Sequence, residues 1–330
     1  MDFSQLMDRA AGHVEARIIQ TAVELTIFDA LEAADLNAAT VAQNLKLDEQ
    51  ATELLLNALT ALGLLEKHGR SFSLTGVSRR HLLRRSPQYV GGMIGFDAML
   101  WHDWEKLPEA IRTGLPTRPP NMYQSDARET AVFINAMDSL VKARGDAEIL
   151  ATVLDWSKIE SILDVGSGPA TYPIALCEKF LQLRATIVDL PGTLEITDRF
   201  VRGANLSARI ELIAGDYRID PITGSYDAVF LSNIIHGENY GRNTTLMRKL
   251  AANLKPGGRL IVKDHLLDDS RTQPPVGAIF SLLMLLTTDG GRCYSFTEIE
   301  SWMRQAGMDR IEHIELPAPM TSSLVIGWKQ

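Results

Sequence analysis

Ser161-Ile-Leu-Asp-Val-Gly-Ser-Gly-Pro169 is the segment from which the fold of this chain is best inferred. The apolar residues up to Val165 predict a buried parallel strand, and Gly166 and Gly168 predict a tight turn directly after it. Between residues 170 and 180, apolar residues recur at helical spacing. A strand, a glycine turn and a helix in this order open a doubly wound α/β sheet, in which ligands bind outside the carboxyl ends of the strands.

The rest of the carboxyl-terminal half alternates strands with helices, as such a sheet requires. Further strands are predicted at residues 184–188, 209–214, 226–231 and 259–264, with a helix at 241–254 and a turn at 255–258. Two helices, at 276–286 and 296–306, and two strands, at 310–316 and 323–328, complete the pattern. We therefore expect an α/β domain whose seven-stranded sheet is mostly parallel and ends with antiparallel strands.

The first hundred residues carry a different pattern. Apolar positions predict one helix over residues 10–31 and a short one over 41–45, and Asp48 is suited to cap a third that runs to Leu62. Two short strands between residues 64 and 75, joined at His68-Gly69, predict a hairpin. Three helices and a hairpin are typical of a winged-helix unit.

A winged helix raises the alternatives of DNA binding and dimerisation. The third helix carries Glu49 and Glu53 but no lysine or arginine, and the net charge of the chain is −8, so dimerisation is favoured and no nucleic-acid partner is expected. One basic run follows the hairpin and consists of Arg79, Arg80, Arg84 and Arg85. A solvated helix face is favoured for this run over a phosphate site.

Length and composition limit the remaining possibilities. At 330 residues the chain is long for one core, so two domains are expected. The two cysteines, Cys177 and Cys293, support neither a disulfide framework nor a metal site and suit a reducing compartment. The amino terminus lacks a signal-peptide pattern, and the most apolar run, residues 278–286, is too short to span a bilayer. We expect a cytoplasmic protein with no membrane partner and no metal.

Three acids stand at successive strand ends, namely Asp164, Asp189 and Asp216. Each acid alone is compatible with a surface carboxylate or a helix cap. Asp189 follows Gly168 by about 20 residues, where doubly wound folds place the acid that binds ribose hydroxyls. Thr171 replaces the third glycine of a pyrophosphate turn, and Asp164 repels a diphosphate but attracts a cation. The site therefore favours a ligand with ribose, adenine and a positive end, and S-adenosyl-L-methionine has all three.

The sequence resembles a known family at this point: class I S-adenosylmethionine-dependent O-methyltransferases with an amino-terminal winged-helix dimerisation domain. This family includes caffeate, hydroxyindole and bacterial antibiotic-tailoring enzymes. The resemblance rests on residues 25–31, 62–65, 74–75, 164–168, 188–191, 215–216 and 256–258. It implies a dimerisation domain at residues 1–100, linking helices that contribute to an acceptor pocket at 101–155, and a Rossmann-like methyltransferase domain at 156–330. It also implies a homodimer that acts on a small aromatic acceptor.

The resemblance implies roles for individual residues. The residues expected at the cofactor are Asp164, Gly166, Ser167, Gly168, Asp189, Leu190, Gly215, Asp216, Tyr217 and Ser232. Trp104, Met137, Met284 and Thr288 are expected at the acceptor, although taken alone Trp104 and the two methionines favour a place in the core. His236 matches the general base of the family, and Asp264 matches the carboxylate that orients it. A core or surface histidine and a loop-capping Asp264 are the alternatives.

Two departures from the plant relatives affect this assignment. Gly237-Glu238 follows His236 where those enzymes carry Asp-Trp, and Cys293 stands where they carry a second glutamate. The leading hypothesis is metal-independent O-methylation of a phenolic or enolic hydroxyl on an aromatic or polyketide-like acceptor. The alternatives are N- or C-methylation or a hydroxylation that uses the same cofactor, and a DNA-binding regulator that senses the cofactor.

Overall fold

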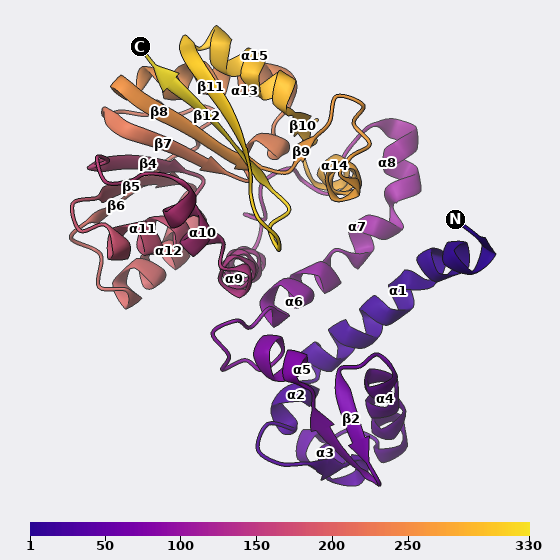
Figure 1. Ribbon diagram of the computed structural model, residues 1–330. Helices are drawn as coiled ribbons and strands as arrows, with labels where there is room; N and C mark the ends of the chain where they lie inside the picture. The colour runs from indigo at the N-terminus through magenta and orange to yellow at the C-terminus, as the bar shows by residue number, and fades with distance from the viewer. The chain divides into compact units, whose positions relative to one another are not determined.

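The computed structural model describes residues 1–330, which form two compact units. The amino-terminal unit comprises residues 1–101 and 135–143, and the carboxyl-terminal unit comprises residues 102–134 and 144–330. Helix α9 (Ala127–Arg144) contributes residues to both units (Figure 1).

The amino-terminal unit contains the predicted helices and hairpin. Its elements are α1 (Phe3–Glu24), α2 (Ile27–Ala30), β1 (Leu36–Asn37), α3 (Ala38–Leu45), α4 (Glu49–Ala61), β2 (Leu65–His68), β3 (Ser71–Leu74), α5 (Gly76–His81) and α6 (Gly91–Met99). Asp48 caps α4 as predicted, because its Oδ1 accepts the backbone N–H of Ala51 at 2.8 Å. The single helix predicted over residues 10–31 is wrong in one respect: it breaks before Thr26, whose φ of +58° is left-handed.

The carboxyl-terminal unit is built on a seven-stranded sheet of order β11-β12-β8-β7-β4-β5-β6. The strands are β4 (Ser161–Val165), β5 (Arg184–Asp189), β6 (Ile210–Ala214), β7 (Tyr226–Ser232), β8 (Leu254–Asp264), β11 (Met308–Glu315) and β12 (Ser323–Lys329). Strands β6, β5, β4, β7 and β8 are parallel, whereas β12 pairs antiparallel with β8 and β11. The predicted α/β fold with an antiparallel finish is therefore confirmed.

Helices cover both faces of this sheet (Figure 1). The helices of the unit are α7 (Trp101–Glu105), α8 (Leu107–Thr113), α10 (Asp146–Val153), α11 (Thr171–Lys179), α12 (Pro191–Gly203), α13 (Tyr240–Ala252), α14 (Pro275–Thr287) and α15 (Phe296–Gln305), with the 3-10 turn η1 (Ile235–Gly237). Leu246, Met247 and Leu250 of α13 pack with Trp302 and Met303 of α15 against the sheet. Strands β9 (Leu266–Leu267) and β10 (Tyr294–Ser295) form a separate parallel pair.

Two sequence predictions need correction in this unit. The alternation of strands with helices holds between β5 and β6, where α12 begins at Pro191, but fails between β6 and β7, where residues 215–225 contain no helix. The turn predicted at residues 255–258 belongs to β8, whose pairing with β7 shifts register between Tyr226 and Ala228. The positive φ of Gly257 permits this bulged start of the strand. None of the helices combines the length and the apolar character needed to cross a membrane.

Candidate active site

A turn with two glycines follows β4 at the carboxyl edge of the sheet, where the candidate site lies. Gly166 and Gly168 have φ values of +70° and +60°, in the left-handed region that favours glycine. A Cβ atom on Gly166 would also lie 2.3 Å from Cδ1 of Ile234, which follows β7. The backbone conformation of the turn therefore favours glycine, and a side chain at position 166 would in addition displace the end of the Ile234 side chain.

Asp164 lies at the end of β4 and is 1% exposed. Its Oδ2 accepts the Ser167 hydroxyl at 2.6 Å, whereas its buried Oδ1 has no hydrogen-bond partner in the protein. Burial raises the pKa of this carboxyl to about 7, the Ser167 hydrogen bond lowers it, and the nearby Asp189 raises it further. A buried carboxylate with a free acceptor suits a cationic or hydrogen-bond-donating ligand group.

Asp189 at the end of β5 is joined to the same turn. Its Oδ2 accepts the N–H of Gly168 at 2.8 Å, and its Oδ1 accepts the N–H of Leu190 at 2.7 Å. Burial raises the pKa of Asp189 to about 6, and these backbone hydrogen bonds oppose the rise. The Thr193 side chain also hydrogen-bonds to this carboxylate, and because each carboxylate oxygen accepts two hydrogen bonds, Asp189 keeps part of its accepting capacity for the hydroxyls of a ribose.

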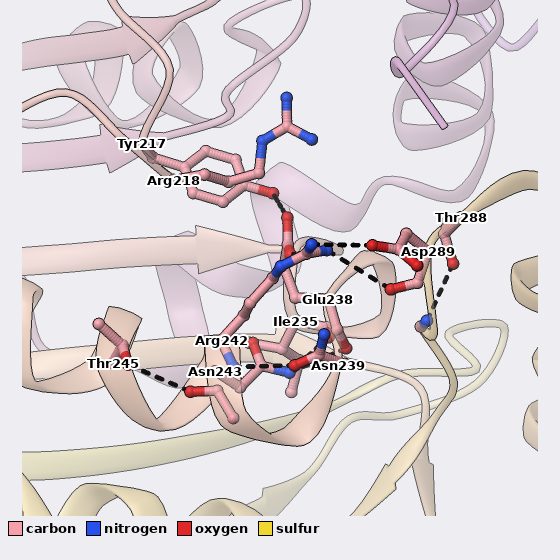
Figure 2. Close-up of polar contacts among 12 residues, drawn as sticks. Tyr217, Arg218, Ile235, Glu238, Asn239, Arg242, Asn243, Thr245, Thr288 and Asp289 are labelled. Carbon is pink, nitrogen blue, oxygen red and sulfur yellow. Dashed lines mark hydrogen bonds and ion pairs between the residues drawn. The ribbon is translucent and has the colours of Figure 1, made fainter. Parts of the chain in front are cut away.

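The acid after β6 is less available than expected. Arg218 donates from Nε and Nη2 to the carboxylate of Asp216, at 2.9 Å to Oδ1 and 2.7 Å to Oδ2. This pairing holds the pKa of Asp216 below its usual value. Tyr217 points its hydroxyl to Oε1 of Glu238 at 2.9 Å (Figure 2). Gly215 donates to the carbonyl of Asp189 at 3.0 Å, and Ser232 ends β7 opposite Lys263 of β8.

His236 and Asp264 are hydrogen-bonded to each other at the ends of β7 and β8. The distance from His236 Nδ1 to Asp264 Oδ1 is 2.7 Å, and the two side chains are 9% and 1% exposed. Burial raises the pKa of Asp264, but the charge and the hydrogen bond of His236 outweigh burial, so the net shift is downward. An ionised Asp264 only accepts, so Nδ1 is the donor and Nε2 of the neutral ring carries the lone pair. Nε2 is therefore able to accept a proton.

Three neighbouring side chains define the surroundings of His236. The ring of Phe280 on α14 meets the imidazole edge-on, with 4.8 Å between the ring centroids. Thr288 donates to the carbonyl of Met284 at 2.7 Å and accepts the N–H of Gly291 at 3.0 Å. Met284 and Thr288 are thus brought to the segment that packs against His236, and both are buried.

The other expected acceptor residues are placed differently. Trp104 lies half-buried on α7, and Met137 lies on the part of α9 that belongs to the amino-terminal unit. Cys293 is a buried free thiol, and burial raises its pKa to about 12, with a further upward contribution from Asp264. The thiol is therefore neutral near pH 7 and does not supply the charge of a second carboxylate.

Glu238 is a site residue that sequence reasoning used only as a departure from the family pattern. It is 4% exposed, and burial raises the pKa of its carboxyl. Its Oε2 has no hydrogen bond, and Nη1 of Arg242 lies 3.6 Å away while Nη2 of that residue binds Asp289 (Figure 2). The available sequence signal was an acid, Glu238, two residues after the candidate base His236. Its hydrogen-bond partner Tyr217 is 21 residues away, so the sequence alone does not indicate the contact.

Comparison with known proteins agrees with this geometry. Residues 109–309 match the O-methyltransferase domain and residues 7–84 match the O-methyltransferase dimerisation domain. The chain is 32% identical to 3-hydroxy-5-methyl-1-naphthoate 3-O-methyltransferase of Streptomyces sahachiroi, over 98% of this chain and 94% of that protein. It is 30% identical to the tetracenomycin polyketide synthesis 8-O-methyl transferase TcmO of Streptomyces glaucescens, over 95% and 93% of the two chains.

Solved structures share the whole fold. An O-methyltransferase family protein from Burkholderia thailandensis superposes with a TM-score of 0.90 at 25% identity, covering 100% of this chain and 98% of that one. PigF with SAH also gives a TM-score of 0.90, at 24% identity and with full coverage of both chains.

The buried Asp164 predicts a measurable dependence of stability on pH. Its carboxyl holds its proton to about pH 7 in the folded protein but only to 3.8 when unfolded, so its contribution to stability falls as the pH rises between these values. We expect Asp164→Asn to stabilise the ligand-free protein at pH 8 by roughly 2–4 kcal/mol, and the difference to vanish near pH 4. Denaturant unfolding at the two pH values measures this.

The exposed Asp309 provides the control, since Asp309→Asn should leave the difference between the two pH values unchanged. If the wild-type protein is instead more stable than Asp164→Asn at pH 8, the buried carboxylate does not destabilise the ligand-free protein, and this prediction is contradicted.

Proposed function

The chain belongs to the family of O-methyltransferases with an amino-terminal dimerisation domain and is an S-adenosylmethionine-dependent enzyme, and from this premise we propose that it methylates a hydroxyl of a small aromatic or polyketide-like acceptor, with His236 as the general base. The observation that carries the proposal is the 2.7 Å bond between His236 and Asp264, at the sheet edge that also bears the glycine turn.

The residues at the strand ends fit the cofactor. The unpartnered Oδ1 of Asp164 suits the cationic methionine end, together with Gly166, Ser167 and Gly168. Asp189 and Leu190 are proposed at the ribose, and Gly215, Asp216 and Tyr217 at the adenine, with Ser232 nearby. When bound, S-adenosylmethionine supplies a methyl group made electrophilic by the positive charge on its sulfur.

The proposed step is an in-line displacement at the methyl carbon. Nε2 of His236 takes the hydroxyl proton of the acceptor, and the acceptor oxygen would then replace sulfur on the methyl group that bound S-adenosylmethionine would supply, with the neutral thioether as the leaving group. Asp264 fixes the tautomer and stabilises the imidazolium that forms, as the acid of a catalytic triad does. Phe280 and the burial of His236 limit access of water to the base.

An aromatic acceptor is the best candidate. Met284 and Thr288 lie beside the His236 segment, and α14 is an apolar helix suited to contact a flat ring. Trp104, which belongs to the same compact unit, is proposed to complete the acceptor pocket. The relative that shares 32% identity is named for a hydroxynaphthoate, which supports a fused aromatic acid with a phenolic hydroxyl as the acceptor class.

A homodimer is proposed from the matched dimerisation domain and from the surface of its helices. Val14 on α1 and Leu54 on α4 are 49% and 66% exposed, and Phe3, Leu6 and Met7 add apolar surface on α1. A groove of about 530 Å³ beside Val14 is lined by Ile18, Leu55 and Trp101. Because exposed apolar residues around an apolar groove mark an interaction site, we propose that a second copy of the chain covers this face.

Replacement of the base tests the catalytic assignment. We expect His236→Ala to lower kcat by about 10²–10⁴-fold while the dissociation constant for S-adenosylhomocysteine stays within about twofold. Asp264→Asn should lower kcat as well, because an amide no longer enforces the reactive tautomer. Transfer of a labelled methyl group to 3-hydroxy-1-naphthoate and related phenols, with calorimetry for the product, measures both.

The exposed His102 offers a matched control, and His102→Gln should behave as wild type. Undiminished turnover in His236→Ala would remove this residue from the mechanism. The mass and position of the product distinguish O-methylation from the alternatives, since a methyl group on nitrogen or carbon, or a gain of one oxygen atom, contradicts the proposed reaction.

The apolar surface predicts a charge-sensitive dimer. We expect the double variant Val14→Glu, Leu54→Glu to elute with the 36.5 kDa mass of one chain in light-scattering chromatography, whereas the wild type elutes with twice that mass. Leu181→Glu, at an equally accessible leucine of the carboxyl-terminal unit, is the control and should remain dimeric. A dimeric double variant would contradict this interface.

A further inference from the structure

The turn that carries His236 is held through its main chain as well as through Asp264. Asn243, which is fully buried on α13, donates from Nδ2 to the carbonyls of Ile235 at 2.8 Å and Glu238 at 3.3 Å. These two carbonyls flank His236 in the sequence. One side chain therefore fixes the backbone on both sides of the imidazole.

Tyr294 holds the same turn from another element. Its hydroxyl donates to the carbonyl of Glu238 at 2.6 Å, and the residue is 1% exposed on β10. Gly291, in the loop before β10, packs directly on the turn, since a Cβ at that position would lie 2.3 Å from the carbonyl oxygen of His236. The loop that approaches the base thus contacts its backbone.

The side chain of Glu238 makes a third contact that holds the turn. Its Oε1 accepts a hydrogen bond from the hydroxyl of Tyr217, which follows β6. Cys293 stands in this loop at the position where the resemblance places a second carboxylate, and its thiol is neutral near pH 7. Besides the bond from His236 to Asp264, the hydrogen bonds that hold this turn are therefore bonds to its backbone and to Glu238.

We propose that Asn243 and Tyr294 are positioning residues for His236, which set the orientation of its imidazole by fixing the two carbonyls that flank it. The proposal rests on the proposed role of His236 as the base. Both side chains are buried donors with main-chain acceptors, so neither touches the reacting atoms. A small displacement of a catalytic group is sufficient to reduce the rate substantially.

The test uses variants that remove one donor each, Tyr294→Phe and Asn243→Asp, in the full-length protein. Matched controls make equivalent bonds elsewhere: Tyr226 donates to the carbonyl of Thr223 at 3.1 Å, and Asn253 donates to the carbonyls of Ile222 and Gly224 at 3.0 Å each. The first readout is the low-field proton resonance of the His236 Nδ1–H group, identified by its loss in His236→Gln. It requires no acceptor.

We expect this resonance to shift or broaden in Tyr294→Phe and Asn243→Asp and to stay unchanged in Tyr226→Phe and Asn253→Asp. The second readout is kcat on 3-hydroxy-1-naphthoate and on its 4-nitro derivative, whose hydroxyl is more acidic. The test variants should lose roughly 10-fold or more on the first acceptor and less on the second, because a more acidic hydroxyl depends less on the base. Affinity for S-adenosylhomocysteine should stay within twofold.

An unchanged resonance in both test variants overturns the proposal, and so does an equal loss of kcat on the two acceptors or a similar loss in the controls. Full turnover in His236→Ala contradicts the proposed function itself. If His236→Ala is inactive but Tyr294→Phe and Asn243→Asp are unaffected, only this inference is contradicted.

Discussion

The hydrogen bond between His236 and Asp264 is the interaction on which the site depends. It joins the ends of β7 and β8, which are neighbours in the parallel sheet, and it fixes which imidazole nitrogen is free. A parallel sheet is suited to this because the carboxyl ends of its strands meet at one edge. The same edge carries the glycine turn and the carboxylates of Asp164 and Asp189, so the groups proposed for ligand binding and for proton transfer lie at one edge of the sheet.

This edge is arranged at some cost to the stability of the free protein. Asp164 and Asp189 are buried with raised pKa values, which means that their ionised forms are poorly solvated until a ligand contributes a positive charge or hydroxyl donors. Asp216 is different, because Arg218 already pairs with it. Of the three acids at the strand ends, Asp164 and Asp189 are therefore the better candidates for binding a ligand. Asp216 already has most of its hydrogen bonds within the protein. Sites that exchange stability for binding in this way are common at functional positions.

Local sequence signals predicted much of the fold and only part of the site. The strand ending at Val165, the glycine turn and the cap at Asp48 follow from short-range chemistry, and all three occur in the structure. The predicted alternation of strands with helices fails between β6 and β7, where residues 215–225 contain no helix. Tyr294 and Asn243 act on the His236 turn through contacts between separate elements, and no spacing rule predicts such contacts.

The central claim is that the imidazole of His236 faces the reacting hydroxyl at the edge of the sheet. The most direct measurement is a crystal structure of the protein with S-adenosylhomocysteine and a hydroxynaphthoate bound together. The account predicts adenosine along the ends of β4, β5 and β6, with Nε2 of His236 about 2.6–3.2 Å from the hydroxyl oxygen. Adenosine bound at another place, or an imidazole turned into the core with its Nε2 away from the acceptor, would contradict it.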